Sequence, residues 1–133
     1  METKWTASDA WLLHAIVMSC GEKNVTSDFR SIVSCGDYIN RSIFNYEEVK
    51  DGVERLMAVD YVEVVDSALR LSRKFRRDVK SIKKPAKDLQ KFTHQLRELL
   101  LTEKLDASKI IALKPEVLSP EKWREAVDAY LES

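Results

Sequence analysis

Apolar residues recur at helical spacing over the first sixty positions, where the pattern predicts three helices. Each begins at a residue that can cap free backbone N–H groups, and the helices span about 6–21, 28–42 and 45–59. Asn45 and Glu48 have the spacing of a capping box, with Phe44 and Val49 placed as a hydrophobic staple. The predicted inner face of the first helix holds Trp11, Leu12, Ala15, Ile16 and Cys20. That of the second holds Phe29, Ile32, Val33 and Ile39, and that of the third holds Val49, Val53, Leu56 and Met57.

After the third helix the pattern changes from helical to alternating. Residues 61–65 and 68–71 read as two strands joined by a tight turn at Asp66–Ser67. Three helices followed by a hairpin is the element order of a winged helix. An irregular helical bundle with an incidental hairpin is the alternative. The predicted fold is therefore mainly α with a small β-hairpin, a winged helix followed by C-terminal helices.

The second half of the chain is again helical in pattern. Ser72 can cap a basic helix that runs to Ile82, and Pro85 interrupts it. A longer amphipathic helix is predicted over about 86–104, then a connector over 106–118, then a helix that begins at Ser119–Pro120. The inner face of this last helix is predicted to hold Trp123, Ala126, Val127, Tyr130 and Leu131.

Length and composition fit one soluble domain. The chain has 133 residues, of which 44% are hydrophobic and 33% charged, and we divide it into a core over 1–72 and a helical extension over 73–133. No apolar run reaches the roughly 20 residues of a membrane span, and no signal peptide is recognisable, so a cytoplasmic location is expected.

The charges cancel overall but are segregated along the chain. Residues 1–72 hold seven Lys/Arg against twelve Asp/Glu, residues 73–91 nine against two, and residues 92–133 six against eight. The basic segment 73–91 could contact a nucleic acid or an acidic partner, or its charges could be solvated or pair with the acidic first half. The candidate contact residues are Arg73, Lys74, Arg76, Arg77, Lys80, Lys83, Lys84 and Lys87.

The third helix is the one that a helix-turn-helix would present to the DNA major groove. If its apolar residues point inward, then Glu47, Glu48, Asp51 and Glu54 point outward together with Lys50 and Arg55. Four acids against two bases would face the phosphates, whose neutralisation supplies most of the affinity for DNA. The sequence therefore argues against docking by this helix, and a protein-interaction module is favoured over a DNA-binding regulator.

The amphipathic helix at 86–104 carries an apolar stripe with two uses. It is wide enough to cover the core and equally suited to pairing with a second copy of the chain. The candidate dimer contacts are Leu89, Phe92, Leu96, Leu99 and Leu100.

Residues 27–62 resemble a group of small bacterial winged-helix-like proteins, relatives in shape of the MarR and PadR regulators. The likeness rests on Gly36–Asp37–Tyr38–Ile39–Asn40, on Tyr46–Glu47–Glu48, on Leu56 before the first strand, and on the ending at 126–130. This chain has Asp60 where that group usually has glycine. The resemblance implies a fold and no catalytic residues.

No enzyme motif is recognisable, and no catalytic, cofactor or metal site is predicted. The sequence lacks a G-x-S-x-G elbow, a phosphate-binding glycine loop and zinc-ligand spacing. Cys20 and Cys35 are expected to be reduced, buried thiols. Asp37 and Asn40 are expected to bond to neighbouring helix ends rather than to take part in catalysis.

Overall fold

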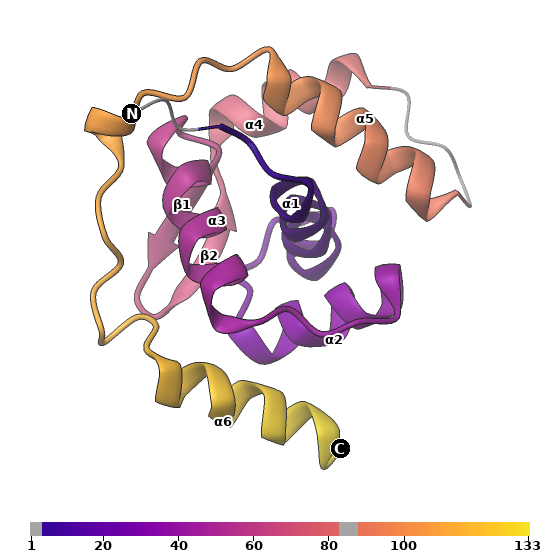
Figure 1. Ribbon diagram of the computed structural model, residues 1–133. Helices are drawn as coiled ribbons and strands as arrows, with labels where there is room; N and C mark the ends of the chain where they lie inside the picture. Colours follow the sequence, from indigo (N-terminus) through magenta and orange to yellow (C-terminus); the bar gives the residue numbers. More distant parts are fainter. Residues whose placement is uncertain (1–3, 83–87) are drawn as a thin grey trace.

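A computed structural model of the chain describes residues 4–82 and 88–133. It is mainly helical with one small antiparallel hairpin, as the sequence predicts (Figure 1). The elements in chain order are α1 (Ala7–Cys20), α2 (Phe29–Asn40), α3 (Tyr46–Ala58), β1 (Val62–Val65), β2 (Ala68–Leu71), α4 (Arg73–Asp78), the 3₁₀ turn η1 (Val79–Ser81), α5 (Leu89–Leu101), the 3₁₀ turn η2 (Ala107–Lys109) and α6 (Pro120–Leu131). Among the described residues, no helix combines the length and the apolar character that crossing a bilayer requires.

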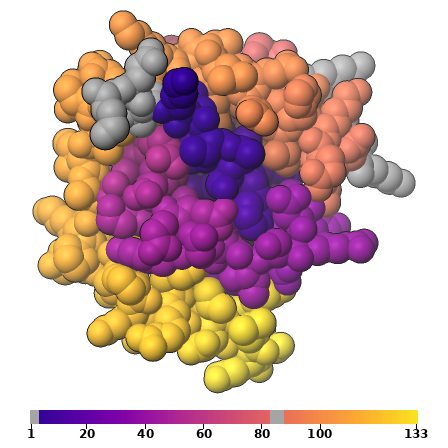
Figure 2. All heavy atoms as spheres, in the orientation of Figure 1, coloured from indigo at the N-terminus to yellow at the C-terminus, as the bar shows by residue number. Residues whose placement is uncertain are grey.

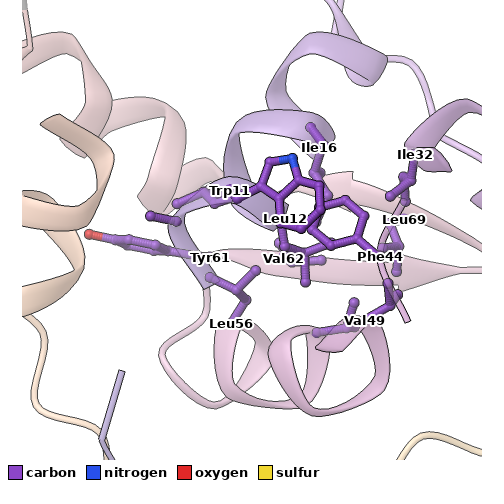
Figure 3. Packing of buried hydrophobic residues seen from close by; sticks show 14 of the residues in the cluster. Trp11, Leu12, Ile16, Ile32, Phe44, Val49, Leu56, Tyr61, Val62 and Leu69 are labelled. Carbon is purple, nitrogen blue, oxygen red and sulfur yellow. The ribbon is translucent and has the colours of Figure 1, made fainter. Parts of the chain in front are cut away.

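Helix α1 is the centre of the molecule. It packs against α2, α3, α5 and β2, so it is buried on nearly every side instead of along one stripe. Leu12 and Ile16 are fully buried in the cluster of Figure 3. The Trp11 ring stacks on Phe44 with a centroid separation of 3.7 Å. The Trp11 indole N–H also donates to the Gly36 carbonyl at 2.9 Å, which joins α1 to α2.

Gly36 lets the Phe44 ring lie directly against α2. A Cβ atom at this position would overlap Cε2 of Phe44, whose ring is also stacked on Trp11.

We expect Gly36→Ala to lower the free energy of unfolding by about 1–3 kcal/mol, because the buried ring has no room to move away. Urea denaturation measures the change. Ser34→Ala, at an exposed position on the same helix, is the control and should stay within about 0.5 kcal/mol of the parent protein. Equal stability of the two variants would show that the ring contact is not tight.

An isolated β-bridge between Ser27 and Leu69 borders the hairpin. β1 and β2 pair antiparallel, and their turn places Asp66 at φ 56°. On the outer side of β2, Ser27 exchanges two backbone hydrogen bonds with Leu69, of 2.7 and 2.9 Å. The Asn24 side chain likewise donates to and accepts from the Leu71 backbone, at 3.0 and 3.2 Å. This arrangement is compatible with the predicted winged helix.

Asp60 forms the junction between α3 and β1. It adopts the left-handed conformation at φ 58°, and its N–H donates to the Met57 carbonyl at 2.9 Å. Aspartate is one of the few residues besides glycine that enter this region readily. The chain therefore makes this left-handed turn with an aspartate and without a glycine.

Three predicted details of the second half are wrong. The basic helix is not continuous to Ile82, because α4 ends at Asp78 and continues only as η1. The helix predicted to reach residue 104 ends at Leu101, because the Glu103 N–H turns back to the Leu100 carbonyl. Leu131 does not lie on the inner face of α6, since it is 63% exposed. The predicted start of the amphipathic helix at 86–87 lies outside the described residues, and α5 begins after Asp88, which caps it.

Candidate functional site: the outer face of helix α3 and the basic segment

The start of α3 is acidic and firmly capped. Asn45 accepts the Glu48 N–H at 2.7 Å and Glu48 accepts the Asn45 N–H at 2.9 Å, which is the predicted capping box. Glu48 also accepts a hydrogen bond from the Ser8 hydroxyl at 2.7 Å. Glu47 and Asp51 are exposed, so the solvent-facing side of the helix carries the negative charge that the sequence predicts.

Glu54 does not point to solvent, which corrects the prediction for this residue. Helical spacing places it near Glu47 and Asp51, away from the core face, yet it is only 6% exposed. The connector between α5 and α6 covers it, and its carboxylate accepts the Leu113 backbone N–H at 2.9 Å. Lys50 pairs with the same carboxylate at 2.8 Å, which raises the pKa of the lysine. The connector is thereby attached to the outer side of α3.

Arg55 is also unavailable to a partner, contrary to the expectation that it points outward. Its guanidinium donates two hydrogen bonds, of 3.0 and 2.9 Å, to the carboxylate of Asp9 on α1. With Lys50 paired to Glu54 as well, both bases of α3 are engaged within the chain. Neither base of α3 can therefore contact a phosphate without giving up an ion pair within the chain.

Helix α6 covers the neighbouring side of α2 and the loop before α3 (Figure 1). The Trp123 indole N–H donates to the Phe44 carbonyl at 3.2 Å, and its ring meets Phe29 edge-on at 6.4 Å. The Tyr130 hydroxyl donates to Asp37 at 2.5 Å. Figure 2 shows the C-terminal segment, which consists of the connector in orange and α6 in yellow, along two sides of the visible face. The C-terminal segment thus covers part of α2 and of the loop before α3.

Asp37 and Asn40 have the structural role that the sequence predicts. Asp37 accepts from Tyr130 near the end of α6, and Asn40 accepts from the Gln90 side chain at the start of α5 at 3.2 Å. Both residues hold α2 to a neighbouring helix.

The basic segment divides into an exposed part and an engaged part. Arg73, Arg76, Arg77 and Lys80 are exposed on α4 and η1. Within the described residues only Arg77 of these four forms an ion pair, with the adjacent Asp78 at 3.3 Å. Lys83, Lys84 and Lys87 lie outside the described residues.

Lys74 is the basic residue of this segment whose charge is engaged within the chain. It donates to the Val59 carbonyl at 2.8 Å, forms an ion pair with Glu103, and lies 5.3 Å from the centre of the Tyr61 ring. Lys74 therefore stabilises the contact between α4 and the chain after α5, and it is not offered to a partner.

The apolar stripe of α5 packs within the chain. Phe92, Leu96 and Leu100 are buried, with α5 lying against α1, while Leu89 and Leu99 are half-buried. His14 of α1 contacts this helix through a hydrogen bond of 2.7 Å to Thr93. The stripe thus has the first of its two predicted uses, and its three central side chains are not accessible to a second copy.

Buried titratable groups serve the fold. Burial raises the pKa of the Tyr61 hydroxyl, and the Glu103 and Asp78 carboxylates add to this effect; the hydroxyl donates to Asp78 at 3.2 Å and points away from the core cluster in Figure 3. Burial also raises the pKa of both thiols, Cys20 and Cys35, which lowers their reactivity. Cys20 is buried as predicted, whereas Cys35 is only half-buried. Over residues 4–82 and 88–133, no group of three His, Cys, Asp or Glu side chains could hold a metal ion.

Comparison with protein-family models, with curated proteins and with solved structures gave no match to this chain.

Proposed function

We propose that this protein is a non-enzymatic winged-helix module of the cytoplasm that acts by binding another protein. The observation that supports this function best is the charge and the accessibility of the outer face of α3. The helix that would enter a DNA groove presents Glu47 and Asp51 to solvent, and the connector covers its side at Glu54.

The energetics of DNA binding disfavour this face. Duplex DNA carries a negative charge about every 1.7 Å, and proteins bind it by neutralising phosphates with lysine and arginine. On α3 both basic side chains are already paired with carboxylates of the same chain. Docking would bring the exposed carboxylates of Glu47 and Asp51 against phosphates, with Lys50 3.7 Å from Asp51, and would require the connector to leave.

A second function is supported by the surface of α4. Arg73, Arg76 and Lys80 are exposed at spacings of three and four residues, and no ion pair joins them to the described residues. Such a row can hold a phosphate backbone without reading its bases. The alternative is thus a dimeric DNA-binding regulator that contacts phosphates through residues 73–91.

Fluorescence anisotropy with labelled duplex DNA, measured across a salt series, distinguishes the two functions. We expect no binding at physiological salt. Weak binding at low salt should be abolished by the triple variant R73E/R76E/K80E, because it removes the exposed row. The control K104E/K109E/R124E makes the same change in net charge at exposed positions on other elements.

Tight binding with a steep salt dependence, lost in the first variant and kept in the control, would overturn the protein-interaction proposal in favour of the regulator.

A further inference from the structure

The two outer edges of the hairpin differ. Leu69 and Leu71 direct their backbone groups away from β1, toward Ser27 and Asn24. In an antiparallel pair, residues opposite such outward-facing residues also face outward on the other edge. Val64 is opposite Leu69, so its N–H and C=O point away from β2. Over residues 4–82 and 88–133 these two groups have no hydrogen-bond partner. Val62, the other outward residue of β1, is buried, whereas Val64 is half-buried, so Val64 is the more accessible of the two.

An apolar groove of about 350 Å³ lies beside this edge. Met57 of α3 and Val64 of β1 line it on one side, and the connector lines it with Ile111, Ala112, Leu113 and Val117. Asp66 and Lys114 also line it and bring opposite charges to the same surface. A backbone edge that is open to pairing, with an apolar groove next to it, is the combination that binds an extended segment: main-chain hydrogen bonds hold it and the groove takes a side chain.

The same face also carries a segment of that kind. The connector runs past the hairpin on the side of β1 in Figure 1, and Ile110 has extended backbone angles of φ −76° and ψ 119°. Ile111 and Ala112 after it are exposed, and Ile111 is 76% exposed, more than any other large apolar residue described. Ile111 thus stands at the border of the groove with most of its apolar surface exposed to water, where a partner could cover it.

We propose that a second copy of this chain occupies this face. Residues 110–112 of each copy pair with Val64 at the β1 edge of the other, and each Ile111 enters the opposite groove. The patch carries both an exposed apolar side chain and a groove, both donor and acceptor backbone groups, and both signs of charge. A contact between identical patches related by a two-fold axis needs this self-complementarity. The inference rests on the proposed function, since it names a second copy as one protein partner.

Analytical ultracentrifugation over a range of concentrations tests the contact. We expect a reversible dimer, and we expect Ile111→Asp to raise its dissociation constant by at least about 100-fold, because two isoleucines leave the interface. Leu101→Asp is the matched control: it changes a residue 64% exposed on α5, and dimerisation should be unchanged. In the parent protein, the amide NMR signals of Val64 and Ile111 should shift with concentration while that of Leu101 does not.

A parent protein that stays monomeric at millimolar concentration would overturn the inference. So would a dimer that Ile111→Asp leaves intact or that Leu101→Asp abolishes. The absence of a dimer would not change the outcome of the DNA-binding experiment. The failure of this inference is therefore distinguishable from the failure of the proposed function.

Discussion

Replacing Arg55 with alanine should destabilise the protein by about 3–5 kcal/mol, the cost typical of removing one partner of a buried ion pair. The Asp9 carboxylate that remains is 0% exposed and would lose both hydrogen bonds from the guanidinium. An unpaired charge in that position has neither water nor a counter-ion to stabilise it.

The position of Asp9 increases the effect. Its carboxylate also accepts the Thr6 N–H at 2.8 Å, in the capping box that begins α1. Gly52 of α3 lies so close to α1 that an added Cβ would be 3.1 Å from Asp9 Oδ1 and 2.6 Å from Leu12 Cδ2. The variant therefore weakens a close contact between α1 and α3 together with the ion pair.

Urea denaturation of Arg55→Ala measures the loss. The comparison variant is Arg70→Ala, which breaks the Glu63–Arg70 pair at the hairpin surface, where both side chains are about two-fifths exposed. That exposed pair should contribute at most about 1 kcal/mol. Similar losses for the two variants would show that Asp9 is stabilised by groups other than Arg55.

Replacing Trp123 with alanine should cost about 3–5 kcal/mol, as expected for a large buried aromatic side chain. The ring is buried against Phe29, and its N–H satisfies the Phe44 carbonyl. Trp123 is the only fully buried side chain of α6 among the described residues, so its loss should detach the helix before the rest of the fold unfolds.

Hydrogen exchange of the α6 amides, followed together with urea denaturation, measures both effects of Trp123→Ala. Leu131→Ala, at an exposed position on the same helix, is the control and should change stability by no more than about 0.5 kcal/mol. Unchanged protection of the α6 amides in Trp123→Ala would contradict the view that this side chain holds the helix.

Trp123→Ala also separates two reasons why the parent protein is expected not to bind DNA. If binding remains absent after α6 is released, the acidity of α3 is sufficient to exclude DNA. If binding appears, the C-terminal cover is the cause, and the protein would be a regulator inhibited by its own C-terminal segment.

The helix starts and the hairpin could be predicted from the sequence because their causes are local. Thr6, Asp28, Asn45 and Ser119 each accept the N–H of the residue three positions later, an interaction that depends on residues within one turn. The change from helical to alternating pattern likewise locates β1 and β2.

The apolar stripe of α5 is a feature whose packing partner the sequence pattern could not predict. Phe92, Leu96 and Leu100 form an apolar face whether it covers the core or meets a second copy, because burial on either surface has the same hydrophobic cause. Only the position of α5 against α1 shows that these side chains belong to the interior.

The sequence by itself determined α1, α2 and α3 with their caps, the hairpin, the start of α6, and the exposed acids of α3 at Glu47 and Asp51. The tertiary structure alone decided which of the charges on that helix remain available. Glu54 and Arg55 look solvent-facing from helical periodicity, but a connector without periodicity covers the first and a residue 46 positions earlier binds the second. Periodicity reports the direction of a side chain around its own helix; it holds no information about which distant segment lies in that direction.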